Sequence, residues 1–209
     1  MRRWWILPLV VGASCTAHQV LLEEQAPPTL HEEPGGYEKA VVTRVIDGDT
    51  IEVQITGRVA GPGAGDAEIG STPSVRLIGI DTPESVTPGS PVECFGREAS
   101  AATTALVDGA RVLLVKDVEE TDRYDRLLRY VYIGEEMANA RLIVNGYAHA
   151  YTYPPNVRHS NLLVRLQRRA RIEERGLWSH DACGEEAAGR PRRAGPVYVV
   201  STLTSIRKV

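Results

Sequence analysis

Five short runs rich in β-branched and aliphatic residues constrain the fold most strongly. The first two runs, 41–46 and 50–55, are separated only by Asp47-Gly48-Asp49, and this spacing predicts a β-hairpin with a glycine turn. The other three runs cover residues 75–80, 111–115 and 127–133. We therefore expect five strands, the third of which stops at Asp81.

Three other segments show the periodicity of helices that bury one face. They cover residues 96–108, 137–145 and 158–175, and glycines at 146 and 176 follow the last two. Short strands with helices inserted between and after them predict an α+β fold that is mainly β, a small barrel capped by three α-helices. An open α+β sandwich fits this order less well.

The connection between the second and third strands, residues 57–74, is long and rich in glycine. This composition predicts a flexible loop without secondary structure of its own. Strand geometry puts the loop at the end of the barrel away from Asp49 and Asp81. We therefore expect that it does not shape a site built on those residues.

Composition limits the chain to one ordinary domain with extra segments, or at most two small domains. It has 209 residues, of which 43% are hydrophobic and 24% charged. The formal net charge of −3 argues against a nucleic-acid-binding protein until its distribution is considered. Residues 1–38 carry two basic and five acidic side chains, residues 39–188 carry 17 and 22, and residues 189–209 carry five basic side chains and no acid. Because acidic and basic side chains are concentrated in different segments, the net charge of the whole chain does not exclude a nucleic-acid partner.

The first 15 residues have the build of a signal peptide. A basic start precedes a short apolar stretch, and Gly12-Ala13-Ser14-Cys15 resembles a bacterial lipoprotein processing box except at Gly12, where that box prefers Leu, Val or Ile. We expect export and lipidation of Cys15, which would anchor the protein to the cell envelope. The alternative is ordinary cleavage after Ala17 and free secretion.

The remaining segments divide by composition. Residues 16–38 contain five glutamates and several prolines and glycines, which predicts a flexible acidic tether. The folded domain is expected at 39–183, followed by a basic C-terminal tail at 184–209 in which residues 197–204 resemble a strand.

Cysteine usage agrees with export. If Cys15 is lipidated or removed, Cys94 and Cys183 remain as an even pair. In an oxidising compartment we expect a disulfide between them, which would fasten the C-terminal segment to the start of the first helix and stabilise the fold by about 2–4 kcal/mol. Two free buried thiols are the alternative, and no Cys/His pair has the spacing of a zinc site.

Three polar clusters interrupt the predicted strands, at residues 47–50, at Arg76 with 81–84, and at 121–126. Antiparallel pairing of the second and third strands places Asp49 and the 81–84 turn at the same end of the sheet. Converging carboxylates without His or Cys favour Ca²⁺ or Mg²⁺ over zinc. Arg76 lies inside an apolar strand, where an unpaired charge is costly. Carboxylates beside arginines that form bidentate forks suit a phosphodiester whose oxygens gain charge in the reaction.

A purely structural interpretation takes each cluster separately. Asp-Gly is commonly a turn, residues 81–84 can begin a loop, and Arg76 can belong to a core salt bridge. The three together are harder to explain in this way, because turns do not require an arginine inside a strand among acids.

In this order, the clusters resemble the signatures of the staphylococcal nuclease-like (thermonuclease) family. The matching stretches are residues 45–50, 76–84, 96–99, 121–128, 150–156 and 176–178, and they cover about 39–180. The resemblance implies a five-stranded OB-type barrel and Ca²⁺-dependent hydrolysis of DNA and RNA, with single strands preferred, little sequence preference and 3′-phosphate ends. It also implies that Asp49 and Asp81 bind the calcium with the backbone carbonyl of Thr82, and that Glu84 orients or deprotonates the attacking water.

The same resemblance implies the substrate contacts. Arg76 and Arg126 correspond to the phosphate clamps of the family, and the residues placed to contact a neighbouring phosphate and the base or sugar are Arg123, Tyr124 and Tyr151. Asp125 departs from the small residue often found at its position and adds a negative charge beside Arg126.

We expect the nuclease to be a monomer. Two rival functions remain from the sequence. One is a non-catalytic OB-type module that binds nucleic acid or protein, although inactive relatives lose a carboxylate or arginine that is present here. The other is a structural lipoprotein of the cell envelope. The arginines of the last helix are expected on a solvated face, with a supporting phosphate-binding role as the alternative; they are Arg165, Arg168, Arg169, Arg171 and Arg175.

Overall fold

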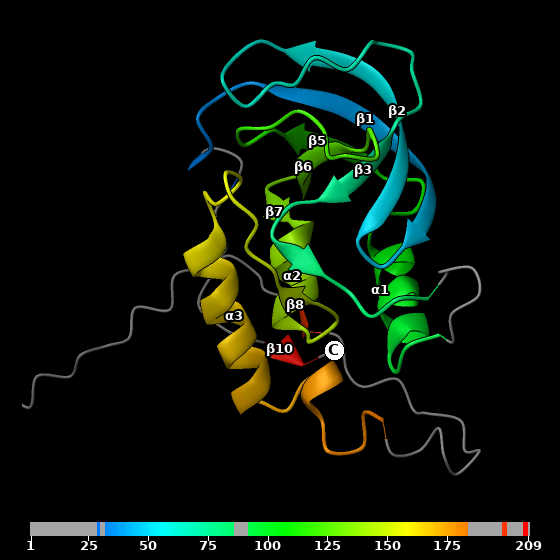
Figure 1. Ribbon diagram of the computed structural model, residues 1–209, viewed down its shortest axis with the longest axis vertical. Coiled ribbons are helices and arrows are strands. Elements are labelled where there is room, and N and C mark those ends of the chain that lie inside the picture. Colours follow the sequence, from blue (N-terminus) through cyan, green and yellow to red (C-terminus); the bar gives the residue numbers. More distant parts are fainter. Residues whose placement is uncertain (1–28, 30–31, 86–91, 184–197, 200–206, 209) are drawn as a thin grey trace, which may run out of the picture.

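The computed structural model describes residues 29, 32–85, 92–183, 198–199 and 207–208. Its largest sheet contains the five predicted strands and one short addition. Figure 1 shows these strands at one end of the molecule and the three helices at the other. The strands of the barrel are β1 (Tyr37–Asp47), β2 (Thr50–Val59), β3 (Ser74–Leu77), β5 (Arg111–Val115) and β6 (Leu127–Ile133).

The sheet closes on itself through β3. This strand pairs antiparallel with β2 and parallel with β6, with Val75 opposite Leu127, while β1 lies between β2 and β5. The two-residue strand β7 (Glu136–Met137) continues from β6. The closed five-stranded barrel confirms the predicted OB-type architecture, and α1 (Gly96–Val107), α2 (Ala138–Val144) and α3 (Ser160–Ile172) match the three predicted helices to within a few residues.

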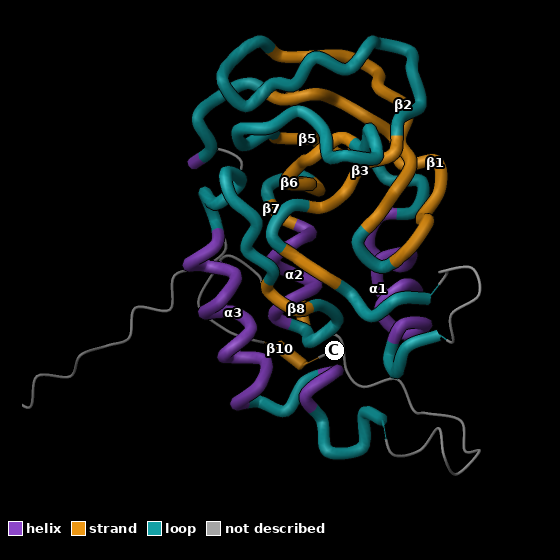
Figure 2. The backbone as a smooth tube through the Cα atoms, in the orientation of Figure 1, coloured by secondary structure: helices purple, strands orange, loops and turns teal. Residues whose placement is uncertain are grey.

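The core fills the barrel and the space between it and the helices. Along β2, Ile51, Val53 and Ile55 are buried in alternation with more exposed neighbours, as expected for a strand with one face inside a barrel. From α3, Leu163 and Leu166 join the same cluster. Residues of the helices and of the strands therefore share one core, and in the tube view the helices lie below the strands of the barrel (Figure 2).

The predicted third strand is divided in two. It was expected to continue over 75–80, but β3 ends at Leu77 and β4 (Ile80–Asp81) pairs with β8 (His149–Ala150) instead of with the barrel. Gly79, between the two strands, has φ +79°, and a Cβ there would lie 2.4 Å from Leu163 Cδ1. The chain turns here because a glycine allows both the left-handed backbone and the close approach of α3.

The domain begins earlier than the predicted boundary at residue 39. Tyr37 and Glu38 already belong to β1, and Glu33 is buried among the hydroxyl of Tyr132 and the side chains of Arg158 and His159. The part of the predicted tether from residue 32 onward is therefore packed against the domain. The hydrophobic pattern of the sequence did not indicate this packing, because the packing depends on one buried charged side chain, that of Glu33.

The connection between β2 and β3 is also different from the expected flexible loop. Strand β2 extends to Val59, and the following loop is fastened by backbone hydrogen bonds to Gly35 and Lys116 through Gly63. The N–H groups of Asp66 and Ala67 donate to the carboxylates of Glu120 and Glu38.

Those two carboxylates share a buried arginine. Arg129 is fully buried, its Nε donates to Glu38 Oε2 at 2.6 Å, and its Nη2 pairs with Glu120. A Cβ on Gly65 would lie 1.8 Å from Arg129 Nη2, so the loop passes directly over the guanidinium. The loop covers this ion-pair network because the network supplies its hydrogen-bond acceptors.

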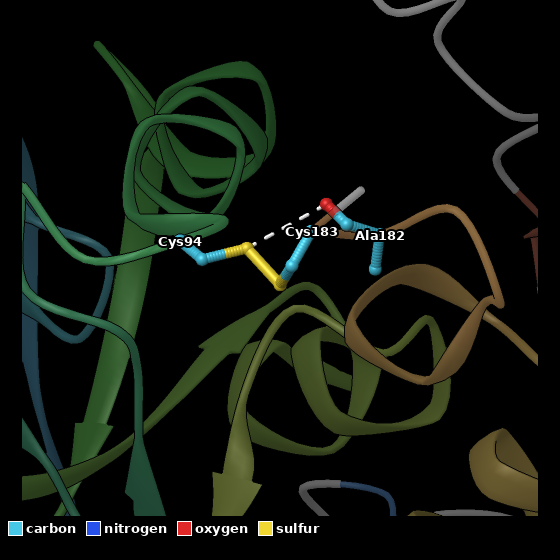
Figure 3. The surroundings of a disulfide bond; sticks show 3 residues. All are labelled: Cys94, Ala182 and Cys183. Carbon is cyan, nitrogen blue, oxygen red and sulfur yellow. Dashed lines mark hydrogen bonds between the residues drawn. A yellow bond between two sulfur atoms is a disulfide. The ribbon is translucent and has the colours of Figure 1, made fainter. Parts of the chain in front are cut away.

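Cys94 and Cys183 form the predicted disulfide. Their Cα atoms are 5.8 Å apart, and Cys94 Sγ lies 3.6 Å from the carbonyl oxygen of Ala182 (Figure 3). Cys94 lies two residues before α1, so the bridge fastens the end of the domain to the start of that helix, as expected.

Other predictions fall outside the described residues. These are the signal peptide with Cys15 and nearly all of the tail, of which only β9 (Tyr198–Val199) and β10 (Arg207–Lys208), paired with each other, are described. Among the helices that the structure describes, none combines the length and the hydropathy that crossing a membrane requires.

Candidate active site

Arg76 joins the two predicted metal-binding carboxylates. From the interior of β3, its Nη1 lies 3.0 Å from Asp49 Oδ2 and its Nη2 lies 2.8 Å from Asp81 Oδ1. Nη1 also donates to the carbonyl of Ile80 at 2.8 Å. The β1–β2 turn supplies one carboxylate and β4 the other, so residues 49, 76 and 81 converge as the sequence predicts.

The Asp49 carboxylate is largely withdrawn from water. It accepts hydrogen bonds from the backbone N–H of Thr82 at 3.0 Å and from the hydroxyl of Thr50 at 2.9 Å. Burial raises the pKa of Asp49 above its ordinary value, although the charge of Arg76 and these hydrogen bonds oppose the rise. A buried carboxylate whose charge is only partly compensated attracts a further cation.

The turn that carries Asp49 is held in place by two neighbours. The hydroxyl of Thr103, on α1, donates to the carbonyl of Gly48 at 2.6 Å. A Cβ on Gly48 would lie 2.6 Å from Thr82 Oγ1, so a glycine is required where these two turns touch. The hydroxyl of Thr82 is buried without a hydrogen-bond partner among the described residues.

The oxygens gathered here fit a calcium ion. The Asp49 and Asp81 carboxylates, which meet at Arg76, are hard oxygen ligands of the kind that Ca²⁺ prefers. The buried charge of Asp49 and the unsatisfied hydroxyl of Thr82 both indicate a polar centre that the protein itself leaves incomplete. In the described residues as a whole, this site included, no group of three or more His, Cys, Asp or Glu side chains is arranged to hold a metal ion, so the protein offers two carboxylates here and not three.

Glu84 lies two residues beyond Thr82 and is exposed. Its backbone is fixed at two points by Glu93: the Glu84 carbonyl accepts from the N–H of Glu93 at 2.9 Å, and the Glu84 N–H donates to Glu93 Oε2 at 3.1 Å. Because Glu93 is adjacent to Cys94, the disulfide lies beside the segment that positions Glu84.

Arg126 is oriented by Asp122 rather than disturbed by Asp125. Arg126 Nε donates to Asp122 Oδ2 at 2.7 Å, and Nη1 lies 3.4 Å from the hydroxyl of Thr50. Burial alone would raise the pKa of Asp122, but hydrogen bonds from Arg126 and from two backbone N–H groups outweigh it, and the pKa lies below its ordinary value. Asp125 is exposed, with a left-handed φ of +61°.

A cavity of about 540 Å³ brings the predicted substrate-binding residues together. The guanidinium of Arg123 lies 4.8 Å from the ring centre of Tyr124, and Tyr151 stacks with Tyr153 at 6.4 Å with an angle of 13° between the rings. These tyrosines are at least half exposed, so their rings are available to a ligand. The cavity is lined by Arg76, Leu77, Ile78, Gly79, Ile80, Glu119, Thr121, Asp122, Arg123, Tyr124, Arg126, Leu128, Tyr151, Tyr153 and Asn156.

The sequence that forms this site is similar to sequences of known proteins. A family model described as staphylococcal nuclease homologue matches residues 74–180. Thermonuclease from Staphylococcus intermedius is 39% identical over 141 residues, which cover 68% of this chain and 76% of that protein. The chain belongs to the staphylococcal nuclease family. Thermonuclease from Staphylococcus hyicus is 38% identical over 139 residues (66% and 75%), and Endonuclease YncB from Bacillus subtilis (strain 168) is 32% identical over 138 residues (65% and 59%).

Two functional residues of this family member were not singled out from its sequence. Asp122 orients Arg126; it lay in the polar cluster at 121–126, and its place four residues before the arginine could have indicated this role. Tyr153 stacks on Tyr151, and the spacing of two residues along an extended segment could have placed both rings on one side.

Proposed function

We propose that the chain is a calcium-dependent nuclease that hydrolyses phosphodiester bonds of DNA and RNA with little sequence preference and leaves 3′-phosphate ends. One observation carries the proposal: Arg76 bridges the Asp49 and Asp81 carboxylates beside a cavity that a second arginine and stacked tyrosines line. The family membership and the names of the thermonuclease and endonuclease relatives support the same reaction.

The proposed chemistry assigns one task to each group. Asp49, Asp81 and the Thr82 carbonyl would hold Ca²⁺, which when bound polarises a phosphoryl oxygen and lowers the pKa of nearby water. Glu84 would accept the proton of the water whose oxygen forms the new bond to phosphorus. The phosphorus–ester bond then breaks, and the leaving oxygen takes a proton from solvent.

The arginines would supply charge where the reaction needs it. The phosphoryl oxygens gain negative charge as the water adds, and Arg76 and Arg126 present fixed guanidinium groups to them. Their carboxylate partners Asp49, Asp81 and Asp122 orient both groups before the substrate arrives.

The remaining cavity residues would bind the adjoining nucleotide. Exposed aromatic rings accept any base by stacking, which favours single strands and gives little sequence preference. Tyr151, Tyr153 and Tyr124 supply such rings, and Arg123 supplies a cation for a neighbouring phosphate.

Digestion of single-stranded DNA tests the proposal. We expect cleavage with calcium, none after chelation, and at least a 10²-fold lower rate for Glu84→Gln. Glu68→Gln, which removes an exposed carboxylate outside the cavity, should cleave like the wild type. Activity that survives chelation, or a Glu84→Gln variant as fast as the wild type, would contradict the mechanism.

We further propose that the enzyme is an exported monomer, anchored to the cell envelope by a lipid on Cys15. The basic and apolar start of the chain and its processing-box-like residues 12–15 support this. Metabolic labelling with palmitate should mark the wild type and not Cys15→Ser, and gel filtration of the soluble domain reports its oligomeric state. Equal labelling of both proteins would refute the anchor.

A further inference from the structure

A short two-stranded ribbon connects the cavity to a second cluster of side chains. At one end of the ribbon, the N–H of Tyr151 donates to the carbonyl of Gly79 at 3.0 Å, and both residues line the cavity. At the other end, Asp81 in β4 pairs with His149 in β8. A strand advances by about 3.3 Å per residue, so Asp81 and His149 lie only about 7 Å along the ribbon from the cavity end.

His149 begins a chain of stacked groups beyond that far end. Its ring meets the Trp178 ring edge-on, with 5.0 Å between their centres, and the guanidinium of Arg171 lies 4.2 Å from the centre of the Trp178 ring. None of these three residues is among those that line the cavity. The cluster therefore lies outside the cavity, at the end of the ribbon where His149 pairs with Asp81.

Arg171 belongs to the flank of α3 that faces the ribbon. Gln167, one helical turn earlier, accepts a hydrogen bond from the N–H of Ala150 at 2.8 Å. Arg171 therefore adjoins the Asp81 end of the ribbon through Trp178 and His149, although it comes from a different element.

The positive charge of Arg171 is available to a ligand. Its side chain is exposed, and in the described part of the chain it makes no salt bridge. Stacking on Trp178 restricts the side chain without consuming its hydrogen-bond donors, which lowers the entropy lost when it binds an anion. Arg169, two residues earlier, differs because it is paired with Glu173 at 3.0 Å.

We propose that Arg171 binds a backbone phosphate of the single-stranded substrate on the side of the scissile bond away from the cavity. This rests on the proposed nuclease function. An enzyme that cuts within a strand has substrate on both sides of the cut, and the cavity holds the groups that we assign to one side. The ribbon leads from the cavity to Asp81 and His149, and the stack of Trp178 and Arg171 begins at His149, so a strand that leaves the cavity along the ribbon would meet an oriented guanidinium there.

Substrate length provides the test. For Arg171→Gln, we expect KM on a single-stranded 12-mer to rise about fivefold, and the slope of log affinity against log salt to become less negative by about 0.7, the value for one phosphate contact on a single strand. KM for a mononucleotide p-nitrophenyl phosphodiester, which has no chain beyond the cavity side, should not change. Arg171→Lys keeps the charge and should recover part of the loss.

The controls separate this inference from the function on which it rests. Arg169→Gln makes the same substitution on the same helix and should leave both KM values at the wild-type level. Equal 12-mer KM and salt slope for Arg171→Gln and wild type would overturn the inference while cleavage by the wild type stands. A loss of binding to phosphatidylglycerol vesicles with an unchanged 12-mer KM would instead assign Arg171 to a membrane surface and also overturn it. Failure of the wild type to cleave any substrate refutes the proposed function itself.

Discussion

Replacing Arg129 with methionine should cost the domain about 3–5 kcal/mol of unfolding free energy, the usual penalty for removing one partner of a buried ion pair. Arg129 and Glu38 are both fully inaccessible to solvent. After the substitution, the Glu38 carboxylate would keep only the N–H of Ala67, at 3.0 Å, among its present donors. Glu120 is less affected, because it is partly exposed and also lies 3.5 Å from the ammonium of Lys116.

Urea and thermal unfolding of the oxidised protein, followed by circular dichroism, measure this loss. For a domain of this size, each kcal/mol corresponds to about 2–4 °C in Tm, so a decrease of about 6–20 °C is expected. Activity should fall as well, since Glu120 begins the segment that carries Asp122 and Arg126, and its carbonyl accepts from Arg129 Nη1 at 3.0 Å.

A double variant isolates the cause. Arg129→Met with Glu38→Gln removes both charges and keeps an acceptor for Ala67, so it should recover at least half of the lost stability. A single variant within about 1 kcal/mol of wild type, or a double variant no more stable than the single, would refute the assignment of the penalty to an unpaired buried carboxylate.

Two further substitutions test other parts of the fold. Asp125→Gly should stabilise the domain by about 1 kcal/mol in urea unfolding, because it relieves a left-handed backbone at φ +61° in a non-glycine residue; a less stable variant would show that Asp125 makes a compensating contact. Burial would raise the pKa of Glu33, but hydrogen bonds from His159 and Tyr132 and the charges of His159 and Arg158 lower it below the ordinary value of 4.5. The ionised Glu33 therefore stabilises the fold above about pH 4.5 and ceases to do so as the pH falls through its lowered pKa, so the stability gap between wild type and Glu33→Gln should narrow from pH 7 to pH 3. A difference in stability between wild type and Glu33→Gln that stays constant from pH 7 to pH 3 would show that the Glu33 charge is not its source.

Sequence patterns sufficed wherever the deciding residues are neighbours in the chain. The glycine turn between β1 and β2, the arginine inside β3 and the acids that follow it each carry a local signature, and barrel closure brings them together. The helix limits follow within a few residues from the period-3.6 pattern, whereas β1 and β2 are longer than their predicted runs and the predicted third strand is divided.

The features missed from the sequence depend on pairs that are distant in the chain. Glu38 meets Arg129 across 91 positions and Glu33 meets Arg158 across 125. No periodicity marks a buried charge, and a glycine-rich, acidic composition describes an exposed segment equally well. The loop after β2 was therefore expected to be flexible, although its backbone satisfies carboxylates on two other elements.

Some of the proposed catalytic groups lie inside the loop that the disulfide closes and others lie before it, so a protease cut in the chain affects them differently. Cys94 and Cys183 are 89 positions apart, so a protease cut anywhere between them leaves one covalent molecule. Arg123, Arg126 and Tyr151 lie within that ring, whereas Asp49, Arg76, Asp81 and Glu84 precede it. One cut between Glu84 and Cys94 would separate the carboxylates and Arg76 from Arg123, Arg126 and Tyr151. Non-covalent contacts would then hold the two pieces together, among them the pairing of β1 with β5, of β3 with β6 and of β4 with β8, and the Glu38–Arg129 ion pair.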